Sequence, residues 1–225
     1  MRHCLYCLKE IGKEELNTVF LRDDPLCPAC RKALQGHFRR GRLGSLRYTC
    51  LYSYGPDSLF REMLLQYKEA YDEALAPVFL APYAETLKLR YRSFTLVCLP
   101  SAPSHEAERG FCHLEEITRC LDLPRKRITM KEDLSQKGKT KEERKQMEGN
   151  FCFLDEIREN EKILLFDDVL SSGATMRGAY RLLRQKTASI RIFVLSEAQR
   201  EASFCTERRF LFPASKVLLN KIERC

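Results

Sequence analysis

Residues 163–183, ILLFDDVLSSGATMRGAYRLL, constrain the fold most, because they join three unlike pieces in one short stretch. The apolar run at the start predicts a buried strand, and MRGAYRLLRQKTA predicts the helix that follows. Between them, Asp167 and Asp168 stand side by side, where like charges repel, and SSGAT predicts a small-residue turn. A strand that ends in acids before a turn and a helix is typical of a ligand site in an α/β sheet.

The rest of the chain supports the same fold class. FTLVCLP (94–100) and IRIFVLSEA (190–198) predict buried strands, and LRYTCLYSYG (46–55) predicts a strand pair or hairpin. Two apolar stripes predict helices, one in 58–88 that Pro77 breaks or restarts, and one in 111–123: Leu59, Met63, Tyr67, Tyr71, Leu75 and Val78, then Phe111, Leu114, Ile117 and Leu121. Residues 125–150 predict a mobile loop and surface helix outside the core. Strands that alternate with helices indicate an α/β fold with a parallel sheet.

Two C-x-x-C pairs near the N-terminus predict a structural zinc site. Nineteen residues separate the two pairs, which is the spacing of zinc ribbons and treble clefs. The four cysteines are Cys4, Cys7, Cys27 and Cys30. Four sulfur ligands leave no open coordination position for catalysis. We therefore expect a zinc-finger module with a basic extension at residues 1–45 and a second domain at 46–225.

Composition bears on partners and location. The chain has eleven cysteines, an odd number, and MRHCLYCLKE has no signal-peptide pattern, so we expect reduced thiols and a cytosolic protein. The net charge is +8, and residues 31–50 hold six Arg or Lys and no acid. This run predicts either a polyanion partner or a solvated basic face. Candidate nucleic-acid contacts are Arg39, Arg40 and Arg42, with Phe38 and Tyr48 as base-stacking residues.

The acids and the turn together predict a sugar-phosphate site. Backbone N–H groups at a helix N-terminus bind phosphate, and the candidate cradle is Ser171, Ser172, Gly173, Ala174 and Thr175. Carboxylates accept hydrogen bonds from hydroxyls, so Asp167 and Asp168 suit the sugar. A simpler alternative is an acidic pair that only caps the helix. A P-loop NTPase is excluded, because the first Walker glycine before Gly138-Lys139-Thr140 would fall at Asp133.

The stretch ILLFDDVLSSGAT resembles the phosphoribosyl-pyrophosphate (PRPP) motif of type I phosphoribosyltransferases. Together with the four cysteines, RGF at 109–111 and ERKQMEGNF at 143–151, the chain resembles the ComF family along nearly its whole length. The family often has TTG where this chain has Ser171-Ser172-Gly173, a change that keeps the hydroxyls. It often has Asn-Gln where this chain has Cys112-His113, so no role is carried over to those two residues.

The resemblance implies a type I phosphoribosyltransferase fold behind a zinc finger. It also implies a role in natural transformation, in which single-stranded DNA enters the cytoplasm beside a ComFA-type helicase at the inner face of the membrane. An active enzyme would displace pyrophosphate from PRPP with Mg²⁺, with Asp167 and Asp168 beside the cationic sugar. The loop 101–110 is the candidate pyrophosphate cradle, with Arg109 as its charge partner or as a plain surface arginine. The basic loop 137–144 is either a lid or a solvated linker.

Two functions from different classes remain open at this point. In the first, the chain is a DNA-handling accessory protein that retains a PRPP pocket. In the second, it is an active phosphoribosyltransferase that acts on a nucleobase, ammonia or another acceptor. No acceptor site is readable in the sequence, and the zinc module could contact either DNA or the helicase.

Overall fold

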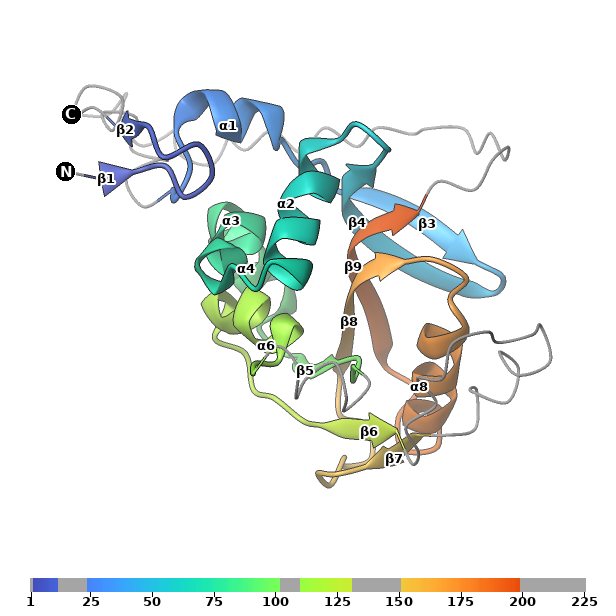
Figure 1. The fold of residues 1–225 in the computed structure, drawn as a ribbon. Helices are drawn as coiled ribbons and strands as arrows, with labels where there is room; N and C mark the ends of the chain where they lie inside the picture. Colours follow the sequence, from blue (N-terminus) through green and yellow to red (C-terminus); the bar gives the residue numbers. More distant parts are fainter. Residues whose placement is uncertain (1, 12–23, 102–109, 131–150, 199–225) are drawn as a thin grey trace, which may run out of the picture.

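The structure is a computed structural model that describes residues 2–11, 24–101, 110–130 and 151–198 (Figure 1). Its centre is a sheet of five strands in the order β3-β4-β9-β8-β5. These strands are β3 (Arg39–Leu43), β4 (Leu46–Tyr54), β5 (Thr95–Cys98), β8 (Ile163–Leu170) and β9 (Ile190–Ala198). β4, β9, β8 and β5 are mutually parallel, and only the edge strand β3 is antiparallel. The predicted α/β class with a parallel sheet is therefore confirmed.

Helices cover both faces of this sheet (Figure 1). The helix α8 (Ala174–Arg184) packs against β8 and β9 on one face. The other face carries α2 (Leu59–Glu69), α3 (Ala76–Leu80), α4 (Ala84–Tyr91) and α6 (His113–Thr118), with short 3-10 turns η2 (Glu73–Leu75), η3 (Ala81–Tyr83) and η4 (Arg119–Leu121) between and after them. The central strands are buried on both sides, as the unbroken apolar run Ile163–Phe166 requires. Within the described residues, no helix is long and apolar enough to cross a bilayer.

The first predicted helical stripe, in 58–88, is confirmed with one exception, whereas in the second stripe Phe111 lies before α6. Met63, Tyr67, Leu75 and Val78 are fully buried, and Pro77 stands at the start of α3, where its missing N–H has no cost. Tyr71 is the exception, because α2 ends at Glu69. It adopts a left-handed backbone with φ of 57° and is 43% exposed.

The predicted hairpin within 46–55 is wrong, because these residues form the single strand β4. The hairpin instead pairs β4 with β3 and turns at Gly44-Ser45, where Gly44 has a φ of 64°. Tyr48 lies across from Gly41, and a Cβ on that glycine would stand 2.2 Å from the Tyr48 ring. The predicted domain boundary at residue 45 falls in this turn, so the hairpin spans it.

A second, smaller sheet corrects the prediction for residues 125–150. β6 (Ile128–Met130) pairs antiparallel with β7 (Phe151–Phe153) beside α8. Ile128 is buried against the core, as is Phe151 just after the predicted segment, so the start of 125–150 belongs to the core. Residues 131–150, which include the loop 137–144, lie outside the described residues.

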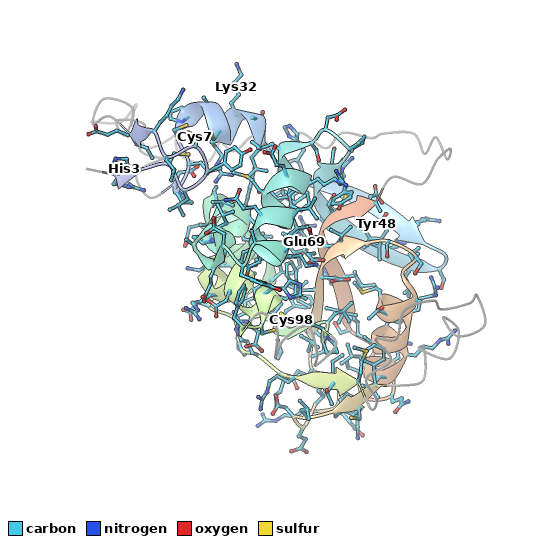
Figure 2. All side chains as sticks on the ribbon, viewed as in Figure 1. His3, Cys7, Lys32, Tyr48, Glu69 and Cys98 are labelled. Carbon is cyan, nitrogen blue, oxygen red and sulfur yellow. The ribbon has the colours of Figure 1, made fainter. Side chains whose placement is uncertain are left out.

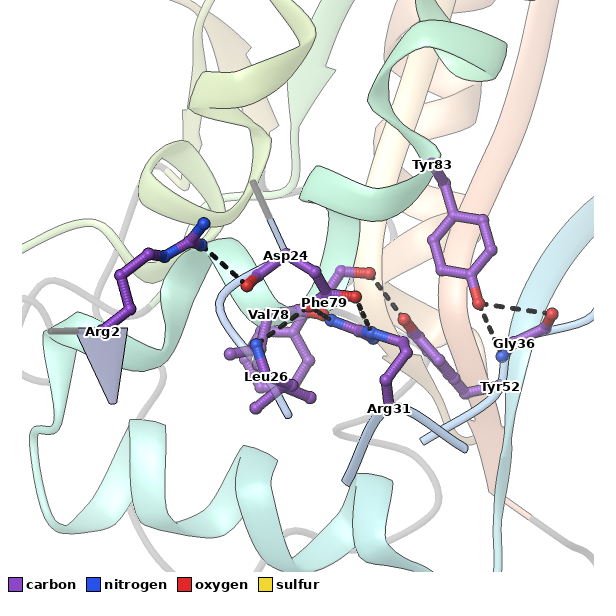
Figure 3. A network of polar contacts seen from close by, with 9 residues as sticks. All are labelled: Arg2, Asp24, Leu26, Arg31, Gly36, Tyr52, Val78, Phe79 and Tyr83. Atoms are coloured by element: carbon purple, nitrogen blue, oxygen red, sulfur yellow. Dashed lines mark hydrogen bonds and ion pairs between the residues drawn. The ribbon is translucent and has the colours of Figure 1, made fainter. Parts of the chain in front are cut away.

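The N-terminal module consists of β1 (Arg2–His3), β2 (Glu10–Ile11) and α1 (Pro28–Ala33). Arg31 joins it to the main body: its guanidinium donates to both carboxylate oxygens of Asp24, at 2.6 and 2.8 Å, and to the Val78 carbonyl at 3.1 Å (Figure 3). Tyr6 Oη donates to Glu62 Oε1 on α2 at 2.5 Å. The two-point contact with Asp24 lies inside the module and fixes the orientation of Arg31. The bonds from Arg31 to Val78 and from Tyr6 to Glu62 join the module to α3 and α2.

Candidate functional site

The acidic pair lies at the carboxyl end of β8, directly before the turn into α8. Asp168 is only 5% exposed, whereas Asp167 is half-buried. Each carboxylate accepts a hydrogen bond from the next backbone N–H: Asp167 Oδ1 from Asp168 at 2.9 Å, and Asp168 Oδ1 from Val169 at 2.6 Å. The neighbouring acids are therefore built into the end of the strand.

Two side chains from other elements converge on Asp168. Lys68 Nζ, in the last turn of α2, lies 2.7 Å from Asp168 Oδ2, and His113 Nε2, at the start of α6, lies 2.8 Å from the same oxygen. Ser101 Oγ is 3.2 Å from the other ring nitrogen of His113. Lys68, Asp168 and His113 are named the Asp168 cluster below. It brings α2, α6 and β8 to one point.

The cluster separates the two acids electrostatically. Burial tends to raise the pKa of Asp168, but the His113 hydrogen bond and the Lys68 charge outweigh it and hold that pKa below its ordinary value. For Asp167, burial and then the negative charge of Asp168 raise the pKa well above the ordinary 3.8. Asp168 is thus the firmly ionised member of the pair.

Lys68 and His113 were not predicted from the sequence. His113 belongs to the pair of residues to which no role was carried over from the family resemblance, and the structure places its ring on Asp168. One signal could have found it: His113 begins the helix after β5, and β5 is the neighbour of β8. Lys68 is 100 residues from Asp168 and sits on an ordinary amphipathic helix, so nothing local marks it.

The turn after the acids has the predicted form. Ser171 and Ser172 are exposed, and Gly173 caps α8 with a φ of 72°. A Cβ on Gly173 would stand 2.2 Å from the Leu43 side chain of the β3–β4 hairpin. Glycine is therefore required twice, for its left-handed backbone and for this close approach. Ala174 and Thr175 open α8, whose first N–H groups have no intrahelical acceptor and suit a phosphate.

Arg109 cannot be placed relative to these groups, because residues 102–109 lie outside the described part of the chain. Its assignment to pyrophosphate remains a prediction. Ser101, at the start of the same loop, does reach His113, so the strand-to-loop junction lies beside the Asp168 cluster.

The four predicted zinc ligands come together at one point. The Sγ atoms of Cys4, Cys7, Cys27 and Cys30 all lie within 4.8 Å of one another, and Cys7 Sγ is 3.7 Å from Cys27 Sγ. A tetrahedral Zn²⁺ with Zn–S bonds of about 2.3 Å separates its sulfurs by about 3.8 Å. Burial raises the pKa of Cys4, but backbone N–H groups led by that of Cys27 outweigh it and lower this pKa. The donors fit zinc.

The predicted nucleic-acid residues divide between surface and core. Arg40 and Arg42 are exposed on β3, and Arg42 pairs directly with the exposed Arg47 of β4. Arg39 is half-buried and donates to the Tyr52 carbonyl at 2.7 Å. The three exposed residues Arg40, Arg42 and Arg47 are named the hairpin arginines below.

The two aromatic residues predicted to stack on bases have structural roles instead. Tyr48, labelled in Figure 2, is buried, and its hydroxyl donates to Glu197. Phe38 is half-buried, and its ring packs against Tyr83 and Phe193. The stacking assignment is therefore wrong for Tyr48. For Phe38, the core contacts of the ring leave less of its surface available to a base.

We predict that the purified chain contains about one zinc ion and that Cys27→Ser removes it, because three thiolates hold the ion less tightly than four. Metal content measured by mass spectrometry, with the melting temperature from circular dichroism, checks this. Cys120→Ser is the control, since Cys120 lies outside the cluster. Unchanged zinc content in Cys27→Ser would contradict the assignment.

The free energy of unfolding of the wild type is expected to fall as the pH rises from about 5 to 8, and we predict that it falls less in Asp167→Asn. A carboxyl with a raised pKa supports folding below its ordinary value and loses that contribution as the pH rises through the folded value. The depressed pKa of Asp168 acts in the opposite sense, below this window. Urea denaturation at both pH values measures the effect, with exposed Asp57→Asn as the control. Equal pH dependence in the wild type and Asp167→Asn would contradict the raised pKa.

No family model matches this chain. The Competence protein ComFC of Bacillus subtilis (strain 168) is 27% identical over 226 residues, which cover 85% of this chain and 93% of that protein. The Competence protein ComFC of Streptococcus pneumoniae (strain ATCC BAA-255 / R6) is 31% identical over 133 residues, which cover 57% of this chain and 58% of that protein.

Solved structures with partial similarity are hypoxanthine phosphoribosyltransferases. One from Staphylococcus aureus has 15% identity and a TM-score of 0.35, over 60% of this chain and 71% of the other. One from Trypanosoma cruzi has 16% identity and a TM-score of 0.38, over 60% and 75%. The similarity to ComFC competence proteins along most of the chain, together with the four-cysteine cluster, supports a member of the ComFC family.

Proposed function

We propose that this chain handles incoming single-stranded DNA during natural transformation, together with a helicase partner, and carries a PRPP-binding site at the end of β8. The similarity to competence proteins supports the first part. The observation that carries the second part is the junction of β8 and α8, where two acids precede a glycine-capped helix start. Hydroxyl acceptors and phosphate-binding N–H groups then stand next to each other, as a sugar phosphate requires.

Each half of the ligand has a matching group. The 5′-phosphate lies in the turn 171–175, on the N–H groups and hydroxyls at the start of α8. The ribose hydroxyls lie on the acidic pair. Mg²⁺ bound with PRPP would supply positive charge to the departing pyrophosphate, and Asp167 is a residue whose carboxylate oxygens could hold it.

Turnover of PRPP is the second candidate function, and the same junction supports it. During displacement of pyrophosphate the sugar becomes cationic, and the firmly ionised Asp168 with Asp167 beside it would stabilise that charge. An acceptor would complete the reaction. In the first candidate function, the pocket binds PRPP without turnover and regulates DNA handling.

DNA contact is proposed for the hairpin arginines. Arg40 and Arg42 face solvent on β3, and Arg47 stands directly opposite Arg42 on β4. Like charges directly across a strand pair are unfavourable unless an anion lies between them. Phosphate groups of single-stranded DNA would supply that anion. Arg39 was also predicted for this role, and its bond to the Tyr52 carbonyl makes it the least available of the three predicted arginines.

We expect isothermal titration to detect PRPP binding in the presence of Mg²⁺ and Thr175→Val to weaken it about tenfold, because a hydroxyl contact to phosphate is lost. Thr129→Val on β6 is the matched control. Pyrophosphate release measured in the same samples, with and without nucleobases, separates turnover from binding alone. No heat of binding with the wild-type chain would overturn the PRPP site.

We expect Arg40→Gln with Arg42→Gln to weaken single-strand binding and to make its salt dependence shallower. Each lost phosphate contact lowers the slope of log K against log salt by about 0.7. Fluorescence anisotropy with labelled oligonucleotide at several salt concentrations measures this. The control is Arg184→Gln with Lys186→Gln, which removes the same charge from the exposed end of α8. Equal slopes in the two variants would assign binding to net charge and not to the hairpin.

A further inference from the structure

Ser101, His113 and Asp168 are joined in that order by two hydrogen bonds. Ser101 Oγ lies 3.2 Å from His113 Nδ1, and His113 Nε2 lies 2.8 Å from Asp168 Oδ2. The three residues come from separate places in the chain, since Ser101 follows β5, His113 begins α6 and Asp168 lies in β8. A hydroxyl, an imidazole and a carboxylate in this order are the parts of a serine nucleophile with its base.

Asp168 determines which nitrogen of His113 carries the proton. It is the firmly ionised acid of the pair, and an ionised carboxylate can only accept hydrogen bonds. His113 Nε2 is therefore the donor to Asp168, and in the neutral ring Nδ1 then has a lone pair on the side of Ser101. The Ser101 hydroxyl is the donor to Nδ1. A general base needs this tautomer.

The imidazole is held in place from several sides. His113 is 4% exposed, and its carbonyl accepts from Tyr67 Oη at 2.8 Å, which ties the start of α6 to α2. Lys68 Nζ contacts Asp168 Oδ2 at 2.7 Å and so fixes the carboxylate that orients the ring. Ser-His-Asp enzymes use the two ring nitrogens the other way round, with Nδ1 on the carboxylate. Either nitrogen can act as a base, so this exchange keeps the chemistry.

Ser101 is more accessible than the base behind it. It is half-buried, whereas His113 and Asp168 are both buried. It follows the buried Leu99 at the carboxyl end of β5, and the carboxyl ends of the strands are where open α/β sheets bind their ligands. A partly exposed hydroxyl in front of a buried base suits a small electrophile, because a large one could not reach the oxygen.

We propose that Ser101 is an activated nucleophile that accepts small acyl groups from activated esters, with His113 as its base and Asp168 as the residue that positions His113. This activity is separate from sugar-phosphate binding. Ser101 Oγ forms a bond to the carbonyl carbon, and its proton passes to His113 Nδ1. The ester C–O bond then breaks, and the leaving oxygen takes that proton. Water attacks the acyl-serine in the same way, which releases a carboxylic acid and restores the hydroxyl.

The test treats the full chain with a small alkyl fluorophosphonate, whose fluoride is displaced by the oxygen of an activated serine. Intact-protein mass spectrometry measures the rate of labelling, and peptide mapping locates the adduct. We expect one adduct, on Ser101, and none in Ser101→Ala. In His113→Gln the rate is expected to fall about 100-fold or more, because glutamine can donate to Asp168 but cannot take the proton. Release of p-nitrophenolate from p-nitrophenyl acetate is expected to follow the same order.

The matched control is Ser45→Ala in the exposed hairpin turn, which is expected to be labelled at the wild-type rate. An unlabelled wild type, or an adduct on another residue, would overturn the proposal. Labelling of His113→Gln at the wild-type rate would overturn the role of the base and the proposal with it. Melting temperatures show whether a variant is folded at the assay temperature. Should His113→Gln not fold, the mapped adduct on the wild type and its loss in Ser101→Ala still decide the question.

Discussion

The ionised Asp168 between Lys68 and His113 is the interaction on which the arrangement of the site depends. It is buried, and its two partners come from helices that are far apart in sequence from β8 and from each other. Removing one partner of a buried ion pair costs about 3–5 kcal/mol, because the other charge is left without compensation. The three side chains therefore help to hold the end of β8, the last turn of α2 and the first turn of α6 together, beside the bond from Tyr67 to the His113 carbonyl.

The N-terminal module is held to the same framework. Tyr6 contacts Glu62 on α2, two turns before Lys68, and Arg31 contacts the Val78 carbonyl on α3. Asp24 organises its own loop as well, since it accepts from the Leu26 N–H at 2.9 Å while it binds Arg31 (Figure 3). The four-cysteine module is thus attached to the helices that cover one face of the sheet, and α2 connects it to the Asp168 cluster through Glu62 and Lys68.

The sequence allowed the parts of the site that are local in the chain to be predicted. The apolar run, the two acids and the glycine turn lie within one stretch, and the four cysteines have a spacing that few other structures use. Lys68 could not be predicted, because its partner is 100 residues away and its helix shows only the usual apolar stripe. The hairpin was misplaced for another reason. The sequence of β3 lacks the apolar alternation of a strand, because it contains Arg39, Arg40 and Arg42. It also contains Gly41, which is a poor strand residue and packs under the Tyr48 ring.

The hairpin arginines affect how copies of this protein meet one another. β3 is the edge of the central sheet, and an exposed edge strand offers unpaired backbone groups to a second chain. Arg40 and Arg42 lie along that edge with Arg47 beside them, so an approaching copy would bring the same positive charges into contact. This repulsion opposes edge-to-edge association most strongly in dilute salt and less as ions screen it. The charges proposed to contact DNA are therefore also expected to oppose edge-to-edge association of the sheet.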